Sequence, residues 1–210
     1  MIEVIIPALN EEKTIHHIVR ACLHAPSISV VHVMIDADTA DNTYEEARTA
    51  GASVNRYHGV KGKGQLINYV AQVVQTPRVM LCDGDYTRFS PHIAEIATAI
   101  HHSNDTMRII VPRMPTPAQW KVGGAPFPFN PGAWGVNSGL RSFPKFLLDD
   151  ITLHGYLVET QLNQAARTRG VIIEQLYEPS FVQPLRFSQR RLEAMEADRA
   201  WGVANGILNA

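Results

Sequence analysis

Short apolar runs alternate with amphipathic segments along the first half of the chain. The apolar runs predict buried strands at residues 2–6, 30–35, 52–57, 79–82 and 107–111. The segments between them predict helices at about residues 10–24, 41–50, 62–74 and 91–100. Asn10, which precedes two glutamates, is expected to cap the first helix. The alternation predicts an α/β fold with a mostly parallel sheet flanked by helices.

The second half of the chain has a different pattern. Residues 112–139 are rich in proline, glycine and aromatic side chains, among them Trp120 and Trp134, and predict an ordered loop at a binding site. Helices are then expected at about 142–148, 155–168 and 188–207, with one strand at 171–177. We therefore expect a single domain over residues 1–210, with a first half ending at 111 and a second half beginning at 112.

Composition narrows the class of protein. The chain has 210 residues, 45% of them hydrophobic, and a net charge of −1, which argues against a general polyanion-binding protein. The two cysteines, Cys22 and Cys82, exclude a disulfide scaffold and a cysteine-built zinc site, and we expect buried thiols. No run approaches the ~18 apolar residues of a membrane span. We expect a cytoplasmic protein.

Charged residues lie at the ends of two of the predicted elements, in patterns that suit a phosphorylated ligand. Asp83-Gly84-Asp85 comes directly after a predicted strand, where two carboxylates can hold a divalent ion against a diphosphate. Lys61-Gly62-Lys63-Gly64 opens a predicted helix, where glycines and a helix N-terminus favour phosphate binding. Each motif alone has a simpler interpretation, a turn for the first and a solvated basic loop for the second.

Glu159 is an acidic residue within the largely apolar segment 153–162. One interpretation is a surface carboxylate paired with a neighbour such as Arg167. The other is a carboxylate held at a site, where it would orient an acceptor hydroxyl or take its proton.

Together these segments resemble the nucleotide-sugar glycosyltransferases of the GT-A fold. The resemblance rests on four motifs in the family's order, namely IIPALNEEKTI from residue 5, DADTADNT from residue 36, KGKG from residue 61 and DGD from residue 83. A fifth segment, GYLVE from residue 155, is similar to one in the retaining glucosyl-3-phosphoglycerate synthase group, whose pattern is the nearest.

The resemblance implies a hexose transfer from a UDP-sugar, with glucose as the expected hexose and Mg²⁺ or Mn²⁺ as cofactor. It implies nucleotide-sugar contacts by Pro7, Ala8, Leu9, Glu11, Asp36, Lys63, Asp83 and Gly84. It also implies that Asp85 and Asp83 hold the metal, and that Glu159 and Asp85 are the catalytic residues.

Some positions depart from the family pattern. Asp38 stands where the family has glycine, and the segment EPSFV at 178–182 lacks the family's metal-binding histidine. The family's phosphoglycerate pocket is replaced by the loop at 112–139, so phosphoglycerate is not the expected acceptor. Trp120, Trp134 and Arg113 are the candidate acceptor residues. The positively charged second half, at +3 against −4 for the first 105 residues, suits a hydroxymethylated base in viral DNA as acceptor, and a small metabolite is the other expectation.

Two other functions fit an α/β sheet of this kind. A nucleotidyltransferase needs a glycine-rich loop after its first strand, but PALN stands there at residues 7–10. A non-catalytic nucleotide-sugar-binding module has no need of the intact Asp83 and Asp85 pair. We therefore expect a glycosyltransferase, and a homodimer is one expectation for its assembly.

Overall fold

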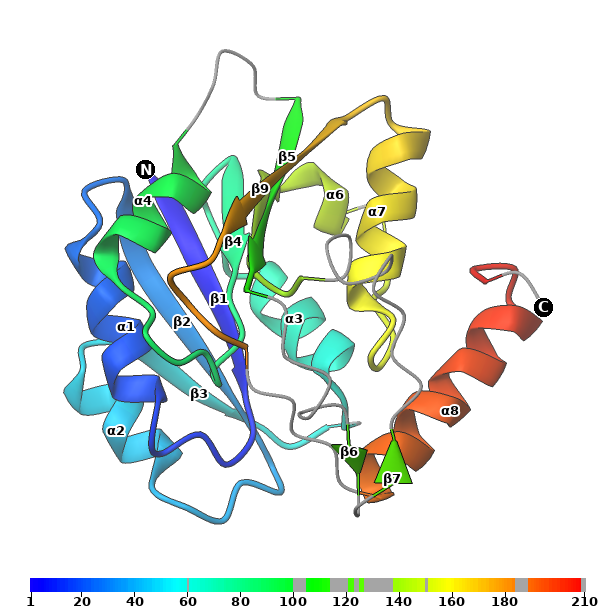
Figure 1. Cartoon of the computed structure of the whole chain (residues 1–210), viewed down its shortest axis with the longest axis horizontal. Helices are drawn as coiled ribbons and strands as arrows, with labels where there is room; N and C mark the ends of the chain where they lie inside the picture. The colour runs from blue at the N-terminus through cyan, green and yellow to red at the C-terminus, as the bar shows by residue number, and fades with distance from the viewer. Residues whose placement is uncertain are drawn as a thin grey trace.

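A computed structural model of the chain describes residues 1–59, 61–99, 105–113, 121–122, 125–126, 138–149, 151–183 and 189–208. Its centre is a seven-stranded sheet with the order β3-β2-β1-β4-β8-β5-β9 (Figure 1). The strands are β1 (Ile2–Ala8), β2 (Ile28–Asp36), β3 (Ser53–Tyr57), β4 (Arg78–Leu81), β5 (Thr106–Pro112), β8 (Arg141–Pro144) and β9 (Ile172–Glu178). All neighbours pair in parallel except β8, which is antiparallel to β4 and β5. A separate two-stranded pair joins β6 (Lys121–Val122) and β7 (Ala125–Pro126).

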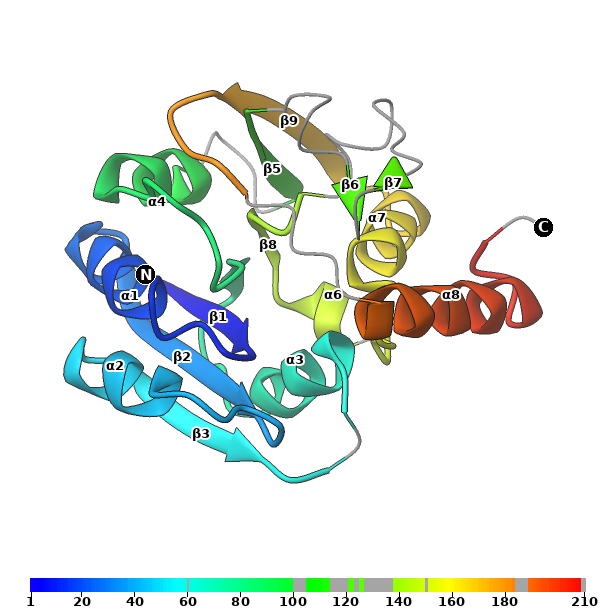
Figure 2. The same ribbon diagram turned by 60° about the horizontal axis from the view of Figure 1, so that its bottom comes forward.

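Helices cover both faces of the sheet (Figures 1 and 2). One face carries α1 (Ile15–His24), α2 (Thr43–Thr49) and α4 (Pro91–Thr98), and the other carries α3 (Lys63–Ala71), α6 (Phe146–Asp149) and α7 (Val158–Thr168). The last helix, α8 (Gln189–Ala204), extends away from the sheet toward the C-terminus. The mostly parallel sheet with helices on both faces confirms the predicted fold class.

The period-2 pattern of β1 explains why two separate hydrophobic cores form. Val4 and Ile6 point into the core shared with α1, α2 and α4, whereas Ile5 points into the core shared with α3, α6 and α7. Since both faces are covered, the strand is apolar at nearly every position, and this continuous run made it predictable.

The first helix begins later than its sequence predicts. Thr14 is its N-cap residue and α1 starts at Ile15, so the expectation that Asn10 caps this helix is wrong. Asn10 instead adopts a left-handed conformation with φ 57°, and its side-chain oxygen accepts a hydrogen bond from Ala40 N at 2.8 Å. A short polar side chain tolerates this conformation because it can bond locally.

The predicted helix at 142–148 is also wrong over its first part. Residues Arg141–Pro144 form the antiparallel strand β8, and only Phe146–Asp149 are helical. The strand lies between β4 and β5, and all four of its residues are buried. Because it includes an arginine and a serine, its sequence has the pattern of an amphipathic segment.

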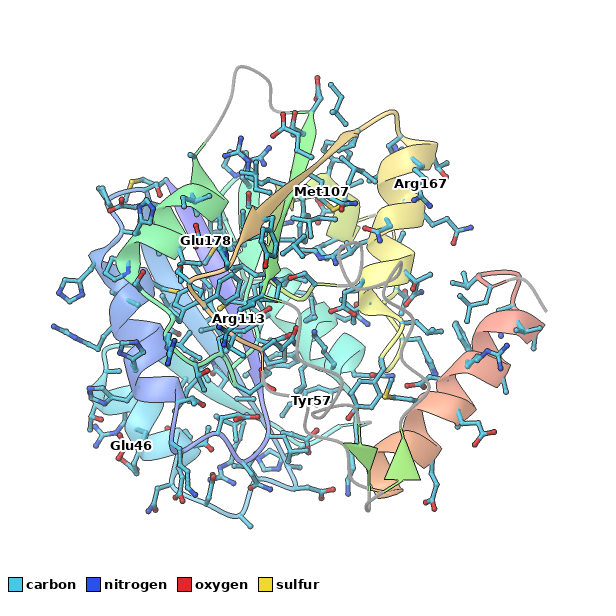
Figure 3. The ribbon with its side chains drawn as sticks, in the orientation of Figure 1. Glu46, Tyr57, Met107, Arg113, Arg167 and Glu178 are labelled. Atoms are coloured by element: carbon cyan, nitrogen blue, oxygen red, sulfur yellow. The ribbon has the colours of Figure 1, made fainter. Side chains whose placement is uncertain are left out.

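The carboxyl ends of the parallel strands meet at one edge of the sheet. Met107, near the start of β5, marks the edge formed by the amino ends of the strands (Figure 3). Tyr57, at the end of β3, marks the edge formed by their carboxyl ends.

Cys22 and Cys82 are buried free thiols, as expected. Within the described part of the chain, no helix is long and apolar enough to cross a membrane.

Candidate functional site

Three hydrogen bonds draw the loops after β1, β2 and β4 together. Glu11 N donates to Thr43 Oγ1 at 2.7 Å, and Thr14 Oγ1 donates to the carbonyl oxygen of Gly84 at 2.6 Å. Glu12 N donates to Asp41 Oδ2 at 3.2 Å. As a result, a Cβ at Gly84 would lie 3.3 Å from Cγ of Glu11, so two of the residues expected to bind the nucleotide sugar are neighbours.

The other residues expected at the nucleotide lie at the ends of β1 and β2. Pro7 and Ala8 are the last two residues of β1, and Leu9 follows them with 44% of its surface exposed. Asp36 ends β2, is buried, and accepts a hydrogen bond from Asp38 N at 2.9 Å.

Asp38 has a partner across the edge of the site. Lys61 Nζ donates to both carboxylate oxygens of Asp38, at 2.6 and 2.7 Å, and so joins the loop after β2 to the loop before α3. The aspartate that departs from the expected glycine therefore contributes an ion pair between two loops of the site. Since the lysine side chain is 56% exposed, the pair contributes at most about 1 kcal/mol.

The glycines around Lys63 permit a close approach of two backbones. Gly64 N donates to Gly155 O at 3.0 Å, and a Cβ at Gly64 would lie only 2.7 Å from the carbonyl carbon of Leu153. Gly62 has φ 131°, a conformation that L residues rarely adopt. The KGKG motif therefore brings the N-terminus of α3 against the segment that leads into α7.

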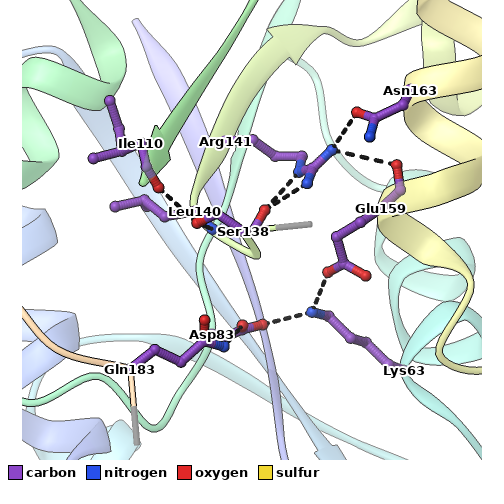
Figure 4. A network of polar contacts seen from close by, with 9 residues as sticks. All are labelled: Lys63, Asp83, Ile110, Ser138, Leu140, Arg141, Glu159, Asn163 and Gln183. Atoms are coloured by element: carbon purple, nitrogen blue, oxygen red, sulfur yellow. Dashed lines mark hydrogen bonds and ion pairs between the residues drawn. The ribbon is translucent and has the colours of Figure 1, made fainter. Parts of the chain in front are cut away.

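Lys63 lies between two carboxylates at the centre of this edge (Figure 4). Its Nζ donates to Asp83 Oδ1 and to Glu159 Oε1, each at 2.6 Å, and the three side chains are 12–17% exposed. Burial alone would lower the pKa of the Lys63 ammonium, but the charges of Asp83 and Glu159 outweigh it and raise this pKa. The cluster thus holds Lys63 firmly protonated, and Glu159 is not a surface acid paired with Arg167.

An aromatic cluster supports the loop that contains Asp83 and Asp85. Tyr86 and Phe89 stack at 6.0 Å, and Phe181, which follows β9, meets the Tyr86 ring edge-on at 5.1 Å. Burial, and next the charge of Asp83, raise the pKa of the Tyr86 hydroxyl well above its ordinary value, so this phenol stays protonated.

Backbone hydrogen bonds between Thr87 and Val182 extend this contact. They bring Gln183 to the site, where its Nε2 donates to Asp83 Oδ2 at 2.8 Å. Sequence reasoning missed Gln183 because its position beyond β9 follows from tertiary packing.

A buried arginine lies behind the same carboxylates. Arg141, on β8, donates from Nε to Ser138 O at 3.0 Å and from Nη1 to Asn163 Oδ1 at 2.9 Å. Sequence reasoning missed both Arg141 and Asn163. An arginine that follows Leu140 and lies two residues before Phe143 is the one signal that could have drawn attention to the segment.

The donor set at this edge suits a hard divalent cation. Asp85 is only 7% exposed, and the Asp83 carboxylate occupies the space that a side chain at Gly139 would need, since a Cβ there would lie 2.0 Å from Oδ2. Mg²⁺ and Mn²⁺ prefer such oxygen ligands and often take one or two carboxylates with phosphate oxygens. No third His, Cys, Asp or Glu completes a metal-binding group within the residues that the structure describes.

One of the three candidate acceptor residues lies in the described part of the chain. Arg113 follows β5 directly, is exposed, and donates its backbone N–H to Phe181 O at 3.3 Å (Figure 3). Trp120 and Trp134 lie outside the described residues.

Comparison with known proteins gives one family and one recurrent fold. The family model described as glycosyl transferase family 2 matches residues 3–135. No curated protein matches the chain significantly by sequence.

Among solved structures, glucosyl-3-phosphoglycerate synthase from Mycobacterium tuberculosis in complex with Mn²⁺ and UDP-glucose is 18% identical, with a TM-score of 0.77 over 100% of this chain and 80% of that chain. The complex of that synthase with Mn²⁺, UDP and glucosyl-3-phosphoglycerate gives a TM-score of 0.78, again at 18% identity, over 100% of this chain and 81% of the other. A further mycobacterial protein matches with a TM-score of 0.67 at 18% identity, over 88% of this chain and 68% of that one. At these identities the likeness shows the shared fold.

Proposed function

This chain belongs to glycosyl transferase family 2, and from that membership we propose that it transfers a hexose, with glucose as the first candidate, from a UDP-sugar to an acceptor hydroxyl. The membership favours this function over a nucleotidyltransferase and over a non-catalytic binding module. The similar synthase has been crystallised with Mn²⁺ and UDP-glucose, which supports the choice of donor.

The observation that carries the proposal is the position of the Lys63 ammonium. It lies 2.6 Å from a carboxylate of the DGD loop and 2.6 Å from Glu159, at the edge of the sheet where ligands of α/β proteins bind. When the donor binds, the ammonium group of a lysine at this place can turn from the carboxylates toward the departing phosphate and stabilise its negative charge.

Asp83 and Asp85 would hold Mg²⁺ or Mn²⁺, which when bound neutralises charge on the diphosphate leaving group. Pro7, Ala8, Leu9, Glu11 and Asp36 would line the nucleoside side, with Gly84 close to Glu11. Glu11 suits the ribose hydroxyls because a carboxylate accepts two hydrogen bonds.

Glu159 would contact the donor sugar or the acceptor hydroxyl. If the reaction inverts the anomeric centre, its carboxylate can take the proton of the acceptor hydroxyl. If the reaction retains the configuration, the same carboxylate orients the acceptor or the sugar instead. In either case the Lys63 ammonium holds the carboxylate in place through a contact of 2.6 Å.

We propose that the acceptor binds on the side of residues 112–139, with Arg113, Trp120 and Trp134 as its contacts. A hydroxymethylated base in DNA and a small hydroxylated metabolite are the two classes to compare, and aromatic side chains suit the stacking of an exposed base. A homodimer is part of the same proposal.

A transfer assay with matched acceptors tests this function. We would incubate the protein with UDP-glucose and Mn²⁺ and measure UDP release with hydroxymethylated DNA, unmodified DNA, 3-phosphoglycerate or no acceptor. The proposal predicts acceptor-dependent UDP release, abolished by EDTA. Release of pyrophosphate from a nucleoside triphosphate and sugar phosphate, with no UDP release from UDP-sugars, would contradict it.

A further inference from the structure

Arg141 is the largest fully buried side chain among the described residues, with 0% of its surface exposed. A buried guanidinium is costly unless hydrogen bonds satisfy it in a fixed geometry. Burial lowers the pKa of this guanidinium, and the charge of Glu159 opposes that effect. Since arginine stays protonated at neutral pH, its buried N–H groups need acceptors within the protein.

The contacts of Arg141 join two segments that flank the carboxylates of the site (Figure 4). On one side, Nε and Nη2 both donate to Ser138 O. On the other side, Nη1 donates to Asn163 Oδ1 at 2.9 Å and to the backbone oxygen of Glu159 at 3.5 Å. Asn163 is four residues after Glu159, so both anchors lie on the same face of α7.

Each anchor fixes one of the two carboxylates that face Lys63. Ser138 is itself held, because its Oγ donates to Ile110 O at 2.6 Å, and it precedes Gly139, over which the Asp83 carboxylate lies. The anchors on α7 set the rotation of the helix turn that carries the Glu159 side chain. Lys63 spans the two carboxylates with two contacts of 2.6 Å, and the bonds of Arg141 reach the backbone behind both of them.

We propose that Arg141 is a positioning residue for the transfer reaction. It sets the separation of the Asp83 and Glu159 carboxylates through its bonds to Ser138, Asn163 and the Glu159 backbone, and it does not touch the substrate. This inference rests on the proposed function, since it assigns Arg141 an effect on turnover through those carboxylates. Small displacements of reacting groups cost up to about 100-fold in rate.

Arg108 offers a matched control. It is 3% exposed, lies on β5 opposite Ser142 of β8, and bonds Glu174 and the backbone oxygens of Ile96 and Ala99. Arg141→Lys and Arg108→Lys each keep the charge and lose the planar fork, so both are expected to lower the melting temperature. Only the first is expected to affect turnover.

The experiment measures kcat and the KM for UDP-glucose well below the melting temperature of every variant. Arg141→Lys is expected to lower kcat at least ~10-fold with KM changed less than about twofold, whereas Arg108→Lys keeps the wild-type kcat. Asn163→Leu should reproduce the loss, and Asn163→Asp, which keeps an acceptor for the guanidinium, should restore most of it. Equal kcat values in Arg141→Lys and Arg108→Lys would overturn the proposal, and Asn163→Leu decides the matter if Arg141→Lys does not fold.

Crystal structures of Arg141→Lys and Asn163→Leu test this inference separately from the proposed function. If the wild-type protein releases no UDP from any UDP-sugar, the proposed function fails, but these structures still test whether Arg141 positions Glu159. The proposal expects the Lys63 Nζ to Glu159 contact to be lost or lengthened in Arg141→Lys or Asn163→Leu. An unchanged contact of 2.6 Å in these variants would overturn it.

Discussion

The two ends of the central sheet both bury charged side chains, yet they hold them differently. At the amino end, Glu3 accepts a hydrogen bond from His32 at 2.6 Å and two more from the backbone of Gln75 and Thr76. At the carboxyl end, Lys63 spans Asp83 and Glu159, and Gly139 leaves the space that the Asp83 carboxylate occupies. Charges at the amino end lock strands and loops together, whereas those at the carboxyl end are arranged around a place where a ligand can bind.

This difference shows how to separate structural from functional charge in such a fold. Removing a charge at the amino end should lower the free energy of unfolding and spare activity. Removing one at the carboxyl end should lower activity and leave the free energy of unfolding near wild type, because groups arranged for a ligand are often not at their stability optimum.

The largest effect is expected from Asp85→Asn. The amide keeps the size of the buried side chain but binds a divalent cation poorly, so turnover of UDP-glucose should fall at least ~1000-fold, in line with the several kcal/mol that a metal supplies. Steady-state rates measure the loss, and circular dichroism checks that the fold is retained. Full wild-type activity in EDTA would contradict the role given to Asp85.

Glu159→Gln should follow, with a loss of at least ~100-fold in transfer, the low end for an acid–base group. Affinity for UDP and the melting temperature should stay near wild type. Glu174→Gln, a carboxylate removed on β9 where it pairs with Arg108, is the matched control and should leave transfer intact. Wild-type transfer in Glu159→Gln would return this residue to a structural role.

Gly139→Ala probes the space under Asp83. Its Cβ would lie 2.0 Å from Asp83 Oδ2, so the carboxylate must move, and we expect UDP affinity in Mn²⁺ to weaken about tenfold, or about 1.4 kcal/mol. Gly170→Ala is a useful comparison, because φ is 68° there but nothing lies within 4 Å of the added Cβ. That variant should lose about 1 kcal/mol of stability and keep UDP binding. Unchanged UDP affinity in Gly139→Ala would show that Asp83 tolerates displacement.

The smallest effect on turnover is expected from Glu3→Gln at the amino end. Burial would raise the pKa of the Glu3 carboxyl, but hydrogen bonds from His32, Gln75 and Thr76 lower it. Because the folded-state pKa lies below the unfolded one, the ionised carboxylate stabilises the fold above about pH 4.3, and this contribution is lost as the pH falls through the folded-state pKa.

We therefore expect Glu3→Gln to cost about 1–3 kcal/mol at pH 7, with wild type and variant converging in acid. Urea unfolding at several pH values measures this, with turnover as the control. A stability difference that grows in acid, or a large loss of turnover, would contradict the contrast between the two ends.

Much of the fold was predictable because its local signals agree. The buried strands β1, β2, β4 and β5 appear as continuous apolar runs, and the carboxylates of Asp83 and Asp85 follow one of them directly. The strand β8 could not be predicted, because Arg141 and Ser142 are polar residues buried in a central strand.

The site was predictable only in part, for a physical reason. Lys63, Asp83 and Glu159 each stand out by residue type, but their contacts join positions 20 and 96 residues apart. Gln183 and Asn163 carry no local signal, because only the packing of Phe181 and the burial of Arg141 bring them to the carboxylates.

The most direct test of the account is the binding of UDP measured by calorimetry, once in Mn²⁺ and once in EDTA. We expect saturable binding in Mn²⁺ that weakens at least about tenfold in EDTA, and a loss of this metal dependence in Asp85→Asn. Binding of wild type with equal strength in both buffers would contradict the assignment of the carboxyl end as a metal-dependent nucleotide-sugar site. Binding in Mn²⁺ that is as strong in Asp85→Asn as in wild type would contradict it too.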